Sequence, residues 1–566
     1  MDISLGDNSI HVLGADILAL ILDELFCEIS PADFYSLALV HSSFYEGIKR
    51  FRGRSQTFHF GRIPGPKITR LTRRHIQDLL ESPRETSIVS NIRQIIITSD
   101  HESEDDEIWI VPCLGNLKVY GKWAELLNLI AAIPRLHTLL FKAFEPMPSF
   151  LVHQLERHHP TARLEIQNWT RHADGAGHTD PCEIALSKSV NLRSIHAELW
   201  ASEARLDLRL AALKRITTFA PNLVEVRIRG EQDSPGYHFR PGRLWNPPSE
   251  DELRDKELTF MPESWSKNSI KSIEVSGKSY LVALNDFVDF SLVENLHIDQ
   301  RQSDSQYAGG ASLLDFISFK SLRHLTIVFS EIFAPIADLE NFRRMASFIL
   351  QCRPLESLEI LESTGKNIDC QSIIRHHGPT LRRLALFETT NSRLVGGDAV
   401  SVSALESIRE FCSNLENIGL NTLFSGEFES IDTTALSILA QIAPLRILRF
   451  KCGFPFETNR GYDSFENSTE SYGFKFRAAN GNWILKLWFF IQARRDEYGF
   501  RPIKEIHLMY PEHIRTSLGP RHFTLDIVRA SERDDRPDEI RVDGNIPGSE
   551  KPTRRILKMA ANTSDG

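Results

Sequence analysis

Residues 341–361 read NFRRMASFILQCRPLESLEIL, and the fold can be inferred from the pattern in this stretch. Apolar residues recur at helical spacing over 341–352. Pro354 then ends the helix, because proline cannot continue it and favours an extended residue before it. The stretch closes on Leu355-x-x-Leu358-x-Ile360, in which apolar and polar residues alternate as in a half-buried strand. The segment therefore predicts a helix, a turn and a strand.

The motif apolar-x-x-apolar-x-apolar returns along the chain, and we call its first apolar residue the lead residue. Lead residues stand at Leu136, Leu192, Leu223, Ile270, Val293, Leu322, Leu355, Leu381, Leu415, Leu445 and Ile503. Between Ile270 and Leu445 they recur every 29 residues or so, and amphipathic segments such as 402–412 and 433–442 lie between them. Strand and helix alternating at this period predict parallel strands on one face and helices on the other.

This pattern resembles the leucine-rich-repeat family in its longer, helix-containing form. The resemblance implies an α/β solenoid over residues 86–512, with parallel strands on a concave face and helices on a convex face. The family often carries Asn or Cys eight residues after the lead residue, where this chain has Lys278, Arg301, Ser330, Ser363, Thr389, Leu423 and Gly453. We therefore expect an irregular array. A non-repetitive α/β domain with ordinary buried strands is the alternative.

Residues 9–52 predict three short helices. Apolar residues at helical spacing follow Asp16, and Ser30-Pro31 restarts a helix with serine at the cap and proline at the first helical position. So small a unit cannot bury enough surface to be stable alone, and it needs to dock on the rest of the chain or on a partner.

The order Leu13, Ile17, Leu25, Ser30-Pro31-x-Asp33 and Leu37-x-Leu39-Val40-His41-x-x-Phe44 resembles an F-box. That family folds as three helices that insert into the helical adaptor subunit of cullin–RING ubiquitin ligases. Gly14 and His41 depart from its usual residues. The resemblance implies an adaptor-binding set of Leu13, Ile17, Ile21, Leu25, Pro31, Leu37, Val40 and Phe44. The alternative is a helical cap that buries the same residues against its own chain.

The remaining segments are predicted from charge. Residues 53–85 carry a run of basic residues and are predicted to be a basic linker. Residues 513–566 are charged, contain Pro and Gly and lack periodicity, so we predict a disordered tail.

Composition and motifs exclude several classes of protein. The 566 residues carry a net charge of −9, which argues against a general nucleic-acid surface, and no apolar run is long enough to span a membrane. Seven scattered cysteines fit reduced thiols, hence a cytoplasmic or nuclear protein. We find no motif for an enzyme, a cofactor or a metal. The pairs His158-His159 and His376-His377 end helices, and we interpret them as histidines at the negative end of the helix dipole rather than as metal ligands.

A client-binding surface is predicted from the alternation of side chains along the strands. Residues between the buried positions face the concave side. They include the apolar Val328, Leu361 and Phe387, which we expect to be exposed, flanked by His297, His324, Glu359 and Arg383. A covering loop or C-terminal segment is an equally weighted alternative.

These features predict a non-catalytic substrate-recognition adaptor of a cullin–RING (SCF-type) ubiquitin ligase. Its partners would be the adaptor subunit and an unknown client protein. The alternative is a repeat scaffold for protein–protein interaction that never joins a ligase.

Overall fold

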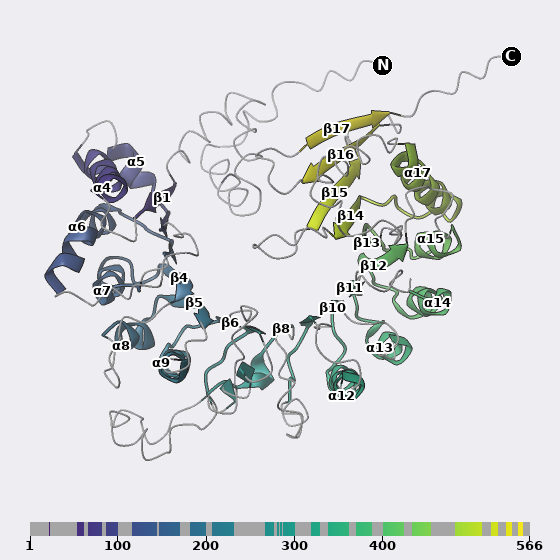
Figure 1. Cartoon of the computed structure of the whole chain (residues 1–566), viewed down its shortest axis with the longest axis horizontal. Helices are drawn as coiled ribbons and strands as arrows, with labels where there is room; N and C mark the ends of the chain where they lie inside the picture. Colours follow the sequence, from purple (N-terminus) through teal and green to yellow (C-terminus); the bar gives the residue numbers. More distant parts are fainter. Residues whose placement is uncertain are drawn as a thin grey trace, which may run out of the picture. The chain divides into compact units, whose positions relative to one another are not determined.

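A computed structural model gives the architecture of the chain (Figure 1). It divides into an N-terminal unit, Met1–Ile270 with Asp286–Val288, and a C-terminal unit, Lys271–Asn285 with Asp289–Gly566. The structure describes residues 22, 54–60, 66–81, 86–99, 116–143, 146–169, 181–199, 206–230, 267–276, 280–281, 284–285, 287–299, 318–328, 338–361, 370–387, 400–423, 433–453, 482–511, 522–529, 539–545 and 553–558.

The N-terminal unit contains six parallel strands in chain order, each paired with the next. Helices lie along one side of these strands (Figure 1). The elements are β1 (Ser55–His59), α4 (Pro66–Glu81), α5 (Thr86–Asn91), β2 (Gln94–Thr98), α6 (Asn116–Ala132), β3 (Thr138–Lys142), α7 (Ser149–His158), β4 (Arg163–Trp169), α8 (Pro181–Lys188), β5 (Leu192–Leu199), α9 (Leu206–Phe219) and β6 (Glu225–Gly230).

The C-terminal unit contains eight further parallel strands, again paired in chain order. Its repeating elements are β7 (Ser272–Ser276), η4 (Phe290–Leu292), β8 (Asn295–Asp299), β9 (His324–Val328), α12 (Asp338–Gln351), β10 (Ser357–Leu361), α13 (Cys370–His377), β11 (Arg383–Phe387), α14 (Val402–Phe411), β12 (Asn417–Leu423), α15 (Thr433–Ala440), β13 (Ile447–Gly453), α17 (Asn482–Glu497) and β14 (Glu505–Pro511). Parallel strands alternating with helices confirm the predicted solenoid-like α/β architecture.

Each of the eleven motifs lies on a strand, and its second and third apolar residues are on the helix side of the sheet. Ile195 and Ala197 on β5, for example, are at most 1% exposed, as are Leu358 and Ile360 on β10. The predicted helices at 341–352, 402–412 and 433–442 are α12, α14 and α15. Period-two alternation in the strands and helical spacing between them therefore determine the core. Among the described residues, no helix is both long enough and apolar enough to cross a membrane.

The alternation begins earlier than predicted, and the prediction of a linker over residues 53–85 is wrong. β1 and α4 lie there. Arg74 of α4 is exposed, whereas Ile76 and Leu79 are buried. Arg73 of α4 pairs with Glu125 of α6, so part of the positive charge serves helix packing.

The prediction of a disordered tail over 513–566 is also wrong for three segments. β15 (His522–Arg529), β16 (Glu539–Asn545) and β17 (Thr553–Lys558) form an antiparallel extension from β14. β15 and β16 alternate apolar and polar residues, as in Phe523, Leu525 and Ile527, and the surrounding charges obscure this short signal; β17 carries only the apolar pair Ile556-Leu557.

The predicted docking unit, 9–52, lies outside the described residues except for Leu22, which is helical and fully buried. The eight predicted adaptor-binding residues are all outside the described part, and their role stays a prediction.

The residue after each lead residue is charged throughout the C-terminal unit. Lys271, Glu294, Arg323, Glu356, Arg382, Glu416 and Arg446 alternate in sign, and Lys504 follows. Their backbones are in register, since each carbonyl accepts two N–H groups from the next repeat, as Lys271 does from Glu294 and Asn295 at 2.8 and 2.9 Å. Ion pairs join Lys271 to Glu294 at 2.9 Å and Arg323 to Glu356 at 3.4 Å. This charge row therefore places opposite charges on neighbouring repeats.

Polar side chains at the turn before the strand replace the missing Asn ladder of the resemblance. Asn191, fully buried, donates to the carbonyls of His159 and Ala162 at 2.9 and 2.7 Å. At the corresponding position in three other repeats, Asn222, Thr380 and Asn414 each bond to a carbonyl of the preceding repeat. The carbonyls are thus satisfied by side chains that precede the lead residue rather than follow it.

We expect Asn191→Ala to lower the free energy of unfolding by about 2 kcal/mol, because the buried carbonyl of Ala162 loses the Asn191 donor and that of His159 keeps only the Ala162 N–H. Asn222→Ala is the matched control. It removes one 2.8 Å bond at an exposed site, so its cost should be about 1 kcal/mol or less. Urea titrations of the full chain compare the two, and equal costs would contradict the role assigned to Asn191.

Candidate functional site

Strand register brings the predicted client-binding residues together on the face of the C-terminal sheet opposite the buried residues, which we call the helix-free face. Leu361 is in register with Val328 on one side and with Phe387 on the other. The flanking residues occupy the same face, on strands β8 to β11: His297, His324, Glu359 and Arg383. The seven residues therefore lie on one face of four neighbouring strands, and their role in client binding stays a prediction.

The predicted exposure of the apolar residues is wrong for two of the three. Val328 is 4% exposed and Phe387 is 8% exposed, while Leu361 is half-buried. Small residues at neighbouring positions allow the Phe387 ring to pack flat against the sheet. A Cβ atom added to Gly419 would be 2.6 Å from the Cζ atom of Phe387. The aromatic ring thus covers β12 instead of projecting from the sheet.

Polar groups form the accessible part of this site. His324 and Arg383 are exposed, and His297 and Glu359 are half-buried. Within the described part of the chain, neither Glu359 nor Arg383 has an ion-pair partner. A partially desolvated charge without a counter-charge costs free energy, which a partner carrying the opposite charge can recover.

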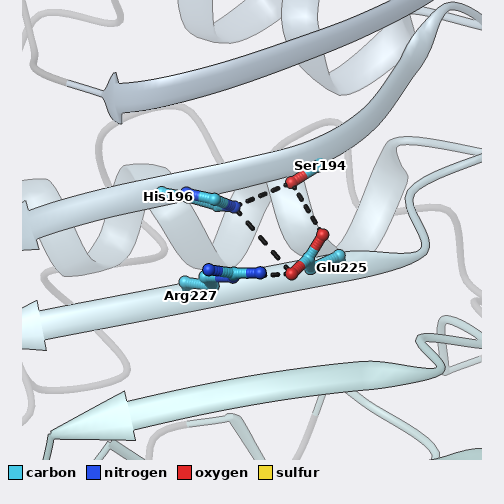
Figure 2. Close-up of polar contacts among 4 residues, drawn as sticks. All are labelled: Ser194, His196, Glu225 and Arg227. Carbon is cyan, nitrogen blue, oxygen red and sulfur yellow. Dashed lines mark hydrogen bonds and ion pairs between the residues drawn. The ribbon is translucent and has the colours of Figure 1, made fainter. Parts of the chain in front are cut away.

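A second polar cluster lies on the helix-free face of the N-terminal unit. Figure 2 shows Ser194 and His196 of β5 and Glu225 and Arg227 of β6 pointing toward one another. Ser194 Oγ is 3.0 Å from His196 Nε2 and 3.2 Å from Glu225 Oε2. Arg227 Nε donates to Glu225 Oε1 at 2.6 Å, and His196 Nε2 is 3.9 Å from the same oxygen.

The serine hydroxyl has one proton, and this determines the direction of the bonds. Ser194 can donate to Glu225 and still bond to His196 only if His196 Nε2 carries a proton and donates to Oγ. The geometry therefore assigns a chain from His196 through Ser194 to the Glu225 carboxylate, which Arg227 neutralises on its other oxygen.

The contacts described among these four residues do not form the relay that activates a serine nucleophile. In a catalytic triad the carboxylate orients the imidazole through Nδ1 while Nε2 accepts the serine proton. Here the carboxylate and the hydroxyl both lie at Nε2, and Ser194 is 6% exposed. The cluster can instead present a fixed arrangement of charge to a binding partner. Among the described residues, no group of three His, Cys, Asp or Glu side chains is placed to hold a metal ion.

The sequence contained a signal for this second cluster. The four residues are the polar positions inside the motifs that begin at Leu192 and Leu223. The alternation rule that gave the C-terminal surface also places them on the helix-free face. Their pairing was not predictable, because it depends on the register Ser194 to Glu225 and His196 to Arg227.

Replacing the shared acceptor should destabilise the N-terminal unit. We expect Glu225→Ala to cost about 1–2 kcal/mol, since Ser194 and Arg227 each lose one bond, the one to the Glu225 carboxylate, at a partly exposed site. Glu165→Ala is the matched control on the neighbouring strand, where the glutamate has no described partner, and it should cost under about 0.5 kcal/mol. Urea unfolding measures both variants. A Glu165 variant as costly as the Glu225 variant would show that the cluster adds nothing specific.

Comparison with known proteins does not assign the chain to a family. No protein-family model matches it, and no curated protein matches it either. The repeat architecture is therefore supported by the structure itself, and the F-box resemblance is supported by the sequence of residues 13–44 alone.

Proposed function

We propose that this chain is a non-catalytic recognition protein that binds a client protein through the helix-free faces of its strands. The observation that carries the proposal is the contrast between the two faces of the C-terminal sheet. The helix side is filled with apolar residues, whereas the helix-free side holds His324 and Arg383 in register with Ser357 on three adjacent strands, and Glu359 two residues further along the middle strand.

Strands support such a surface better than loops do. The three side chains project from paired parallel strands, so little conformational entropy is lost in ordering them when a partner binds. Glu359 and Arg383 have no described counter-charge, which favours a client that supplies one acidic and one basic group. Leu361, half-buried and in register with the buried Val328 and Phe387, adds apolar contact two residues along the strand from Glu359.

A more specific part of the proposal is that residues 9–52 dock onto a ubiquitin ligase. The F-box resemblance supports docking of this segment into the helical adaptor of a cullin–RING ubiquitin ligase. Binding ligase and client at once would make ubiquitin transfer effectively intramolecular, so catalysis would come from proximity and not from side chains of this chain.

Reversing a charge on the helix-free face should weaken client binding. We expect Arg383→Glu and Glu359→Lys each to reduce recovery of the same partner at least tenfold in quantitative affinity purification from cells, because each places like charges in contact. Arg343→Glu is the matched control: Arg343 is exposed on α12, on the helix side. Loss of that partner in the Arg343 variant as well would contradict a site on the helix-free face.

A second measurement tests the ligase. Ile17→Asp and Ile21→Asp should abolish binding to the purified helical adaptor subunit, because a charge would replace an apolar contact. Ser42→Ala, in the same segment, should leave binding unchanged.

The rival function is a scaffold that never joins a ligase. It predicts that the full-length wild-type chain fails to bind the adaptor while the Arg383 and Glu359 variants still lose their client. That result would refute docking to the ligase adaptor but would still support client binding on the helix-free face.

A further inference from the structure

Two buried histidines occupy equivalent places in the two units, and we call His159 and His377 the turn histidines. His159 follows α7 and is 5% exposed; His377 ends α13 and is fully buried. Both side chains reach from the end of their own helix to the turn of the preceding repeat.

The two rings make the same pair of hydrogen bonds. Nε2 of His159 is 2.7 Å from the carbonyl of Ile130, and Nε2 of His377 is 3.0 Å from that of Ile349. Each carbonyl lies six residues before a lead residue. The N–H groups of those lead residues, Leu136 and Leu355, point at Nδ1 at 3.4 and 3.2 Å.

These contacts are compatible with one protonation state. Nδ1 accepts a backbone N–H, so it cannot carry a proton, and Nε2 must donate to the carbonyl. A proton added at Nδ1 would place two N–H groups against each other and a charge in a buried site. The bond to the lead residue would then be lost.

The charged surroundings offer no compensation. Within the described part of the chain, the titratable group whose charge acts on His159 is His158, and for His377 it is His376. The centroids of the His376 and His377 rings are 4.5 Å apart, and the charge of His376 disfavours a positive charge on His377 and so lowers its pKa. From α12 the Cys352 thiol also lies at this turn, but burial raises its pKa to about 12, so it stays neutral. From α14, the neighbour of α13, Phe411 is contacted by Arg375 of α13, another cation.

We propose that the hydrogen bonds of the turn histidines hold consecutive repeats together in a pH-dependent way. Mild acid then opens the turns after α6 and α12, while other turns stay closed. The other turns use donors that do not titrate in this range, such as Asn191, Asn268 and Arg495. Arg495 is fully buried and bonds to the carbonyls of Ile442 and Ala443; burial lowers its pKa to about 10, which still leaves it charged.

The direction of the pH effect follows from the site. Burial lowers the pKa of both turn histidines, that of His377 to about 4 from an ordinary value of 6.5. Above pH 6.5 the histidine is neutral in both the open and the closed turn, so its hydrogen bonds contribute their full stability. As pH falls from 6.5 toward 4, the open turn binds a proton that the closed turn excludes, and stability is lost. For His377 the opening constant should rise by about 30-fold between pH 7.5 and pH 5.

Hydrogen exchange on the full-length chain tests this inference. After correction for the intrinsic exchange rate at each pH, protection at 130–136 and 349–355 should fall by at least tenfold from pH 7.5 to pH 5. Protection at 440–447, the turn held by Arg495, should change by less than threefold. An equal loss at all three turns would overturn the proposal.

His377→Gln supplies a variant that keeps a donor for the Ile349 carbonyl but does not titrate. We expect the pH dependence at 349–355 to disappear while that at 130–136 remains. The matched control His153→Gln alters a solvent-facing histidine of α7 and should leave both unchanged. Persistence of the pH dependence in the Gln variant would overturn the assignment to His377.

A measurement on the wild-type chain covers the case in which the Gln variant fails to fold. Nitrogen-15 shifts of labelled imidazoles should show His377 neutral and protonated at Nε2 at pH 5, and His159 protonated at Nε2 at pH 7.5 with a titration midpoint below 6.5. Titration of either ring near pH 6.5 would refute its part of the proposal.

Discussion

Buried carbonyl groups at the turns between helix and strand are the constraint on which the rest of this structure depends. A helix leaves its last carbonyls without partners, and here the next repeat covers them, so water cannot satisfy them. Each repeat must therefore supply donors to the one before it. Asn191 and Asn268, the turn histidines and Arg495 do this with different chemistry, which explains how repeats of unequal sequence stack in one regular register.

That register decides what the helix-free faces can present. Because neighbouring strands pair residue for residue, side chains from separate repeats fall into rows, and Glu225 meets Ser194 while Leu361 lies between Val328 and Phe387. The rows bring together groups that are about 30 residues apart in sequence. A recognition surface of this kind is built by the stacking and not by any single repeat.

Much of the fold could be predicted from the sequence, because alternation and helical spacing are local properties. All eleven motifs became strands for this reason. The turn donors could not be predicted, because the role of Asn191 depends on its contact with the carbonyl of His159, a residue 32 positions earlier in the sequence. The burial of Phe387 was missed because it depends on the absent side chain of Gly419 on the next strand. β1 and α4 were missed because the run of basic residues in this part of the sequence concealed the helical spacing of Ile76 and Leu79, which are buried.

The alternating charge row has a consequence for how such a chain can change length over evolution. Removing a single repeat between Glu294 and Glu416 would bring two residues of the same sign side by side, whereas removing two adjacent repeats would restore the order of signs. Each like-charged contact at the surface destabilises the fold by only a fraction of a kcal/mol, but every protein that later evolves from the shortened chain keeps this destabilisation. Gain or loss of repeats in pairs is therefore the less damaging route for this array.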